Sequence, residues 1–186
     1  MKTTTKTFAS LFISLLFCAN IVAQTNYYTT TQTFNQSGYT YQCDVVQGNK
    51  MVTLYNKENK LTYTNQVYKA TGKERPLFNN PDDVLDDDWT RTKSEKIVNS
   101  AFSADQRNTV KGDVLFISMY ISPETGKVIE VSFNFTCKGD PFATIPISVY
   151  RKIETDLKNN IWFIPAEDGK KLNYIFRGWN QRITAP

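Results

Sequence analysis

Histidine is absent from the 186-residue sequence, and this absence removes a large part of catalytic chemistry. Histidine is the commonest general base and the commonest metal ligand in proteins. Triads built on histidine are therefore excluded, and the few cysteines present do not complete a zinc site of the Cys and His type. No nucleophile elbow, P-loop or dinucleotide fingerprint occurs either. We therefore predict a protein that is not an enzyme, with no catalytic residue, no cofactor and no metal site.

Paired carboxylates could still form an active site, because two acidic side chains facing one cleft can hydrolyse a glycoside. No sequence pattern indicates which two acidic residues would face the same cleft. The candidates for a carboxylate-dependent hydrolase are Asp82, Asp83, Asp86, Asp87, Asp88, Glu154, Asp156, Glu167 and Asp168.

Long apolar runs are also scarce, and the only marked one lies near the start, over residues 8–18. It follows Lys2 and Lys6, the pattern of a secretory signal peptide. A membrane-spanning helix needs about 20 apolar residues, so this run is too short to anchor the mature chain. We predict cleavage of residues 1–23, a mature chain from Gln24 without a membrane span, and a periplasmic or secreted location. Lipid attachment at Cys18 is the alternative, although the residue before it is not small.

Neither sign of charge is in large excess. The formal net charge is +4, and two of the positive charges belong to lysines of the predicted signal peptide. A protein that binds a phosphate backbone needs a strong basic patch, so we expect no nucleic acid partner. The remaining residues, 24–186, are enough for a single compact unit.

Cysteine is rare in the mature chain, which keeps only Cys43 and Cys137. Disulfides persist in an exported compartment, so a disulfide between Cys43 and Cys137 is possible there. Burial of two free thiols as small apolar side chains is the alternative.

Residues 24–75 are rich in tyrosine, threonine and valine, and turn-forming residues interrupt them. Apolar and polar residues alternate from position 39 to 45, as in a strand with one buried face. We therefore predict an antiparallel β-meander with strands over residues 27–34, 39–46, 51–56 and 60–69.

Residues 76–111 contain an acidic loop and a short helix. Thr92 and Glu95 have the spacing of a capping box, and apolar residues then recur at helical spacing to about Phe102. The aspartates of residues 82–88 lie near the positive end of that helix. Calcium binding is the alternative role for these aspartates, but their spacing does not match an EF-hand loop.

Residues 112–186 combine a hairpin, a helix and a last strand. Apolar residues alternate over 115–121 and 129–137 on either side of a Pro-Glu-Thr-Gly turn, which predicts two paired strands. Apolar residues at four-residue steps predict a helix over 147–161. The last strand is expected at Leu172, Asn173, Tyr174, Ile175 and Phe176. The expected fold is α+β, an N-terminal meander plus a ββαβ module, with two helices in all.

Three segments of this module resemble a known family. They are Gly126-Lys127-Val128-Ile129-Glu130-Val131, Trp162-Phe163-Ile164-Pro165 and Asp168-Gly169-Lys170-Lys171. Over residues 112–183 the chain resembles the TonB C-terminal domain, a periplasmic ββαβ fold. The resemblance implies that an envelope protein or peptide adds as an extra strand to an edge formed by Leu172, Asn173, Tyr174, Ile175 and Phe176. The whole chain is also similar to uncharacterised exported proteins of gut Gram-negative bacteria with a domain of unknown function.

Aromatic side chains suggest a second function. Exposed aromatic rings can stack on sugars, but tyrosine is also common in strands for structural reasons. The rings considered are Tyr27, Tyr28, Tyr39, Tyr41, Tyr55, Tyr63 and Trp89. Trp162 and Trp179 are expected in the core or at its edge. The sequence thus favours an exported non-enzymatic binding or protein-interaction protein of the cell envelope. The alternative is a carbohydrate-binding accessory protein of a glycan-uptake system.

Overall fold

The computed structural model describes residues 25–75, 85–86 and 89–186. The predicted signal peptide, its cleavage site and most of the acidic loop lie outside these residues. No helix within the described part of the chain is long and apolar enough to cross a membrane.

A six-stranded antiparallel sheet organises the molecule. Its strands are β1 (Gln32–Gln36), β2 (Tyr39–Val45), β3 (Met51–Asn56), β5 (Val114–Ile121), β6 (Val128–Thr136) and β8 (Ile175–Arg182). They lie in the order β1-β2-β3-β6-β5-β8, so β3 joins the N-terminal strands to the C-terminal hairpin. Two short strands, β4 (Leu85–Asp86) and β7 (Ile164–Pro165), form a separate pair.

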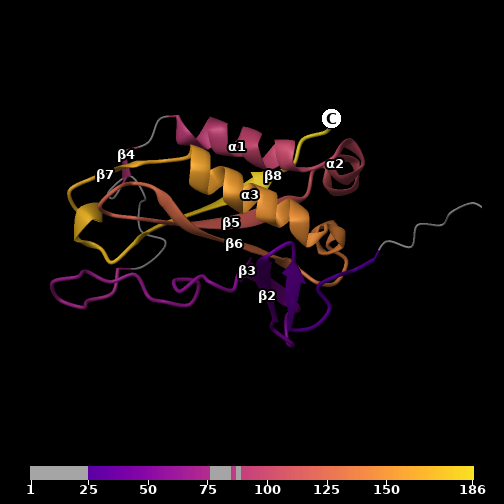
Figure 1. The fold of residues 1–186 in the computed structure, drawn as a ribbon, viewed down its shortest axis with the longest axis horizontal. Helices are drawn as coiled ribbons and strands as arrows, with labels where there is room; N and C mark the ends of the chain where they lie inside the picture. The colour runs from indigo at the N-terminus through magenta and orange to yellow at the C-terminus, as the bar shows by residue number, and fades with distance from the viewer. Residues whose placement is uncertain (1–24, 76–84, 87–88) are drawn as a thin grey trace, which may run out of the picture.

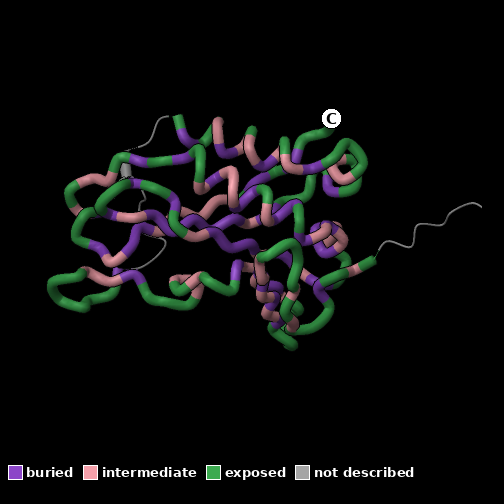
Figure 2. The backbone as a smooth tube through the Cα atoms, viewed as in Figure 1, coloured by how far each residue is buried: buried purple, intermediate pink, exposed green. Residues whose placement is uncertain are grey.

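Helices cover one face of this sheet. The three α-helices of the described residues are α1 (Thr90–Ala101), α2 (Ala104–Val110) and α3 (Ile147–Asn160). The described residues also contain two short 3-10 helices, η2 (Pro141–Thr144) and η3 (Gly169–Lys171). In Figure 1, α1 and α3 lie side by side above the strands. Figure 2 shows the buried residues concentrated along the central strands beneath them. The α+β class is confirmed, but the expected number of two helices is wrong.

An irregular segment, residues 57–75, partly covers the opposite face of the sheet. The prediction of a fourth meander strand over 60–69 is therefore wrong. The backbone N–H groups of Lys60 and Leu61 donate to the Glu130 carboxylate, at 2.9 and 2.8 Å. Tyr120 donates its hydroxyl to the Thr62 carbonyl, at 3.3 Å. Side chains of β5 and β6 thus form hydrogen bonds with this backbone, in place of the backbone hydrogen bonds that a paired strand would make.

The start of α1 also differs from the prediction. The helix begins two residues before Thr92, with Trp89 at its N-cap position and no side-chain capping hydrogen bond. Glu95 pairs instead with Arg91, at 3.2 Å. The true capping box is formed by Ser103 and Gln106 at the start of α2, a helix that the apolar pattern did not predict. Its seven residues are too few for an apolar repeat to be recognised.

The C-terminal hairpin and the helix after it agree with the sequence. Strands β5 and β6 pair antiparallel, and α3 buries Ile153 and Leu157 completely. Gly126 ends the hairpin turn with a φ of 69°, and a Cβ atom there would lie 1.9 Å from the carbonyl oxygen of Phe163. The Phe163 N–H in turn donates to the Gly126 carbonyl, at 2.8 Å. Glycine at position 126 therefore allows the chain that follows α3 to pack directly against the hairpin.

Of the two alternatives for Cys43 and Cys137, the structure has the second, in which both are free and buried. Cys43 lies on β2 and Cys137 follows β6, with β3 between these two strands. Strands two positions apart are separated by about 10 Å, whereas a disulfide requires Cα atoms within about 7 Å. Burial raises the pKa of the Cys43 thiol to about 12, so the group is held as a neutral, apolar side chain.

Candidate functional site

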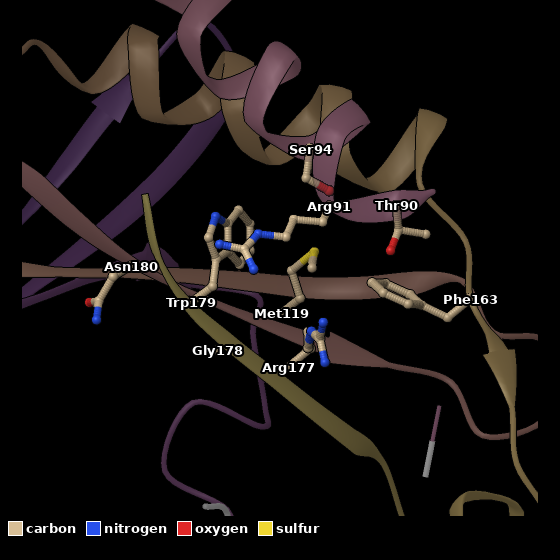
Figure 3. Close-up of a pocket in the computed structure, with 9 residues that line it drawn as sticks. All are labelled: Thr90, Arg91, Ser94, Met119, Phe163, Arg177, Gly178, Trp179 and Asn180. Carbon is tan, nitrogen blue, oxygen red and sulfur yellow. The ribbon is translucent and has the colours of Figure 1, made fainter. Parts of the chain in front are cut away.

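A cleft of about 380 Å³ opens between the first half of α1 and the outer strand β8, and we call it the α1–β8 cleft. Figure 3 shows side chains from α1, β5 and β8 converging on it. It is lined by Thr90, Arg91, Ser94, Met119, Phe163, Arg177, Gly178, Trp179 and Asn180.

The wall formed by α1 is polar. Ser94 is only 3% exposed, and its hydroxyl makes no hydrogen bond within the described residues. Arg91 extends from the preceding turn, and its side chain is 78% exposed. A buried hydroxyl without a partner is unfavourable, so Ser94 marks a place where a ligand atom would stabilise the fold.

The floor of the α1–β8 cleft is apolar. It contains the thioether of Met119 and the ring of Phe163, both almost fully buried. The indole of Trp179 lies beside them, and its Nε1–H donates to Gln181 Oε1 at 3.0 Å. This hydrogen bond orients the ring, so the cleft presents a preformed aromatic surface.

The electrostatic character of the cleft is positive. Arg91 and Arg177 bring guanidinium groups to it, and none of the lining residues that the structure describes is acidic. The first turn of α1, as far as the structure describes it, has neither an acidic residue nor a side-chain cap. The N-terminal end of a helix carries a partial positive charge, which adds to that of the arginines. The cleft is thus suited to an anionic group next to an apolar one.

The outer edge of β8 lies beside this cleft. Among the described residues β8 pairs only with β5, and the Ile183 N–H continues that ladder by donating to Asp113 O at 3.4 Å. In an antiparallel pair, alternate residues direct their backbone groups towards the partner strand. The backbone groups directed away from β5 therefore belong to Phe176, Gly178, Asn180 and Arg182. Gly178 and Asn180 also line the cleft, so the open edge and the cleft are one continuous surface.

The predicted edge residues lie just before this open edge. Leu172 and Tyr174 are buried, and the Asn173 N–H donates to Val67 O at 3.0 Å. Gln66 donates its amide to the Tyr174 carbonyl at 2.9 Å. These first three predicted residues are therefore already covered by the irregular segment, which contains Gln66 and Val67.

Ile175 and Phe176 do begin the last strand, which continues to Arg182. The sequence reasoning missed the rest of β8, because the stretch from Arg177 to Arg182 is mostly polar and lacks apolar alternation. Its polar ends at Asn180 and Arg182 are exposed, as is usual for an edge strand.

The tyrosines considered for sugar stacking are largely engaged elsewhere. Tyr28 and Tyr41 are fully buried and unavailable to a sugar. Tyr55 and Tyr63 both donate their hydroxyls to Asp44 Oδ2, at 2.9 and 2.8 Å. These contacts link β3 and the irregular segment to β2, which is a structural role.

Two tryptophans form an exposed aromatic pair. Trp89 is 38% exposed and Trp162 is 51% exposed, with ring centroids 4.7 Å apart. Lys93 Nζ lies 5.1 Å from the centroid of each ring. The expectation that Trp162 lies in the core or at its edge is therefore wrong, whereas Trp179 is partly buried against the core, as expected.

Glu154, one of the carboxylates considered for hydrolysis, is completely buried beneath α3. It accepts hydrogen bonds from the Tyr41 hydroxyl, from Arg151 at 3.2 Å and from Asn56 at 3.4 Å, and Lys158 lies 3.6 Å away. Burial, and then the neighbouring carboxylate, raise the pKa of the Tyr41 hydroxyl well above its ordinary value. This network attaches α3 to β2 and β3, and its Glu154 side chain is closed off from solvent.

The other described carboxylate candidates form ion pairs at the surface. Asp156 pairs with Lys152 at 2.5 Å, and Glu167 pairs with Lys170 at 2.6 Å. Within the described ranges, no group of three or more acidic or cysteine side chains is placed to hold a metal ion. The run considered for calcium lies mostly outside those ranges.

Comparison with known proteins gives a family and a solved relative. A crystal structure of a DUF5043 family protein from Bacteroides uniformis ATCC 8492 superposes with a TM-score of 0.81 at 45% sequence identity, covering 86% of this chain and 89% of that one. A search of curated proteins found no match. The model of the domain of unknown function DUF5043 matches residues 24–179. The chain therefore belongs to the DUF5043 family.

Proposed function

We propose that this chain is an exported, non-enzymatic binding protein of the cell envelope that captures an extended peptide by strand addition. The observation that carries the proposal is the open outer edge of β8, where the backbone groups of Gly178 and Asn180 are directed away from β5. An extended peptide gains affinity at such an edge from main-chain hydrogen bonds. The adjoining cleft supplies specificity.

The likeness to the TonB C-terminal domain adds a second argument for this function. Strands β5 and β6, helix α3 and strand β8 follow one another in the order that the resemblance implies. Export rests on the signal-peptide pattern of residues 1–23. Purification from the periplasm or medium of an expressing Gram-negative host, followed by N-terminal sequencing, should give a mature chain that starts at Gln24. A chain that keeps Met1 would contradict export.

The function is tested with the substitution Asn180→Pro. Proline removes the backbone N–H at 180, which is directed away from β5, and leaves the hydrogen bonds to β5 intact. We would select binders from a phage-displayed library of random peptides and measure their affinity for the mature protein by calorimetry. Asn180→Pro should weaken binding about tenfold or more, while Asn180→Ala should not. Equal effects of the two substitutions, with unchanged circular dichroism spectra, would contradict strand addition.

Carbohydrate binding is the second candidate function, and the exposed Trp89–Trp162 pair favours it. Exposed indole rings are suitable surfaces for the apolar faces of sugars. Titration with a panel of host and dietary oligosaccharides should quench tryptophan fluorescence in a saturable way, and Trp162→Ala should remove the response. Trp179→Phe is the control, because Trp179 is not part of the exposed Trp89–Trp162 pair. No quenching by any oligosaccharide would exclude this function.

A further inference from the structure

We infer that the α1–β8 cleft binds the C-terminal residue of a peptide, with its free carboxylate at the arginines and an aromatic side chain on the cleft floor. This inference rests on the proposed function, since the rest of the peptide would lie along β8. It adds the chemical class of the partner: a chain that ends in phenylalanine, tyrosine or tryptophan.

The carboxylate is recognised by positive charge from three sources. Arg91 and Arg177 line the cleft, and the N-terminal end of α1, where Trp89 makes no side-chain capping hydrogen bond, lies beside them. Peptide N–H groups at a helix start, together with guanidinium groups, form a good carboxylate site. Within the described part of the chain, no acidic side chain lines the cleft.

Arg91 is able to turn towards a bound carboxylate at little cost. Its present partner is Glu95, at 3.2 Å, in an ion pair whose side chains are 78% and 43% exposed. Exposed pairs between positions i and i+4 of a helix contribute little to stability. A carboxylate in the partly enclosed cleft is less screened by water and would compete well for the same guanidinium group.

The aromatic ring is recognised by the cleft floor. The partly buried ring of Trp179 lies beside Phe163 and the thioether of Met119, a group that makes favourable contacts with aromatic rings. The volume of about 380 Å³ is at the small end of ligand sites, which suits a single residue and not a long segment.

The charged and apolar parts of the cleft adjoin each other, so one residue must carry both groups. An internal aspartate or glutamate has a carboxylate but no ring, and an internal aromatic residue has a ring but no carboxylate. A C-terminal aromatic residue has both. The buried hydroxyl of Ser94, which has no partner among the described residues, can then donate to the carboxylate or to a tyrosine hydroxyl.

The geometry of β8 is consistent with this arrangement. Gly178 and Asn180 belong both to the open edge and to the cleft lining. A peptide paired with this edge therefore passes the mouth of the cleft, where α1 overhangs the strand in Figure 3. Its last residue can turn in beneath α1 while the preceding residues keep their hydrogen bonds to β8.

The test uses three synthetic peptides of alternating threonine and valine with a fluorescent label on the N-terminus. The first ends in phenylalanine with a free carboxylate, the second in phenylalanine amide and the third in alanine with a free carboxylate. Fluorescence anisotropy with the mature protein should show binding of the first. The amide and the alanine peptide should each bind about tenfold more weakly. Equal affinity for all three would overturn the inference.

Protein variants assign the effect to the cleft. Arg91→Ala should weaken binding of the free acid and leave the amide unchanged, and Arg91→Lys should restore part of the affinity. Lys96→Ala is the matched control, because it removes the same charge from α1 outside the cleft lining. Ser94→Ala should weaken binding of the acid by a few-fold without loss of folded structure by circular dichroism. Equal losses from Arg91→Ala and Lys96→Ala would also overturn the inference.

The outcomes separate this inference from the proposed function. If Asn180→Pro abolishes binding of the acid and the amide, and both bind the native protein alike, strand addition stands and the cleft inference fails. If the acid binds more tightly than the amide and Asn180→Pro has no effect, the cleft inference stands and strand addition fails. Absence of binding by all three peptides would overturn the inference, while strand addition would still be tested with the library-selected peptides.

Discussion

Helices α3 and α1 lie side by side on the same face of the sheet, yet they close it to very different degrees (Figure 1). α3 buries mainly large apolar side chains, among them Tyr150, Ile153 and Leu157. The buried residues of α1 are Thr90, Ser94 and Val98, two of which are hydroxyl-bearing. The helix with the small polar contact face is the one that leaves a cleft beneath it.

Polar groups follow the same division. Under α3, the buried Glu154 carboxylate has hydrogen-bond partners from two other elements as well as from its own helix. Under α1, the Ser94 hydroxyl has none in the described residues. Buried polar groups that have hydrogen-bond partners make a protein more rigid. A buried polar group without a partner calls for another explanation, such as a role in binding. The comparison teaches that the sheet is closed under α3, whereas the α1 side leaves the cleft in which we propose that a peptide binds.

The largest effect is expected at Gly126, where the α3 side is joined to the hairpin. Gly126→Ala should destabilise the protein by about 4 kcal/mol or more, because a left-handed backbone and a collision with Phe163 O coincide. Gly139→Ala is the control, since Gly139 also has a positive φ, 75°, but an added Cβ meets nothing within 4 Å. It should cost about 1–2 kcal/mol. Urea denaturation measures both, and equal losses would show that the contact with Phe163 is unimportant.

The next largest effect compares the two helices directly. Ile153→Ala should cost about 2–5 kcal/mol, because Ile153 is fully buried under α3 and truncation leaves a cavity. Ile97→Ala in α1 should cost about 1 kcal/mol or less, because that side chain is only partly buried. Free energies of unfolding from urea titration give both values. Similar losses of stability in the two variants would contradict the distinction between the closed α3 side and the open α1 side.

A smaller loss is expected from the polar network under α3. Tyr41→Phe removes one hydroxyl donor from the buried Glu154 carboxylate, which should cost about 1–3 kcal/mol. Tyr63→Phe removes a similar hydroxyl from a carboxylate at the surface, Asp44, and should cost less than about 1 kcal/mol. Thermal denaturation of the two variants at neutral pH tests the order. A larger effect of Tyr63→Phe would contradict it.

The smallest effect is a dependence on alkaline pH. The pKa of Cys43 is raised by burial from 9.0 to about 12, so the folded state holds this proton over a range in which the unfolded state releases it. This contribution is complete below pH 9 and is lost progressively as the pH rises towards 12. The stability of the native protein should therefore fall more steeply than that of Cys43→Ala as the pH rises above 9. Parallel falls in urea titrations would show that Cys43 does not contribute.

Sequence patterns predicted the elements whose signal is local. Alternation over residues 39–45 identified β2, and four-residue steps identified α3 to within a residue or two. The pattern failed where tertiary contacts supply the stability. Residues 60–69 have strand composition but hydrogen-bond to side chains of β5 and β6, and Trp162 looks like a core residue but lies at the surface.

The candidate site was the least predictable part. Its lining comes from α1, β5, β8 and the segment after α3, and no motif links these in the sequence. Arg91 and Trp179 lie far apart along the chain, and neither has a signal of its own. The one sign of the edge strand was the resemblance to a family with a binding edge, which indicated Leu172 to Phe176 and so reached only the start of β8.

The sequence by itself determined the absence of histidine chemistry, the α+β class and the elements with a clear apolar period, because these depend on residue type and on near neighbours. Tertiary structure decided which strand edge is left open, which cysteines are kept apart and where a polar helix leaves a cleft. Those features depend on the order of strands in the sheet and on how two helices share one face. Such long-range arrangements are not encoded in any single stretch of the chain.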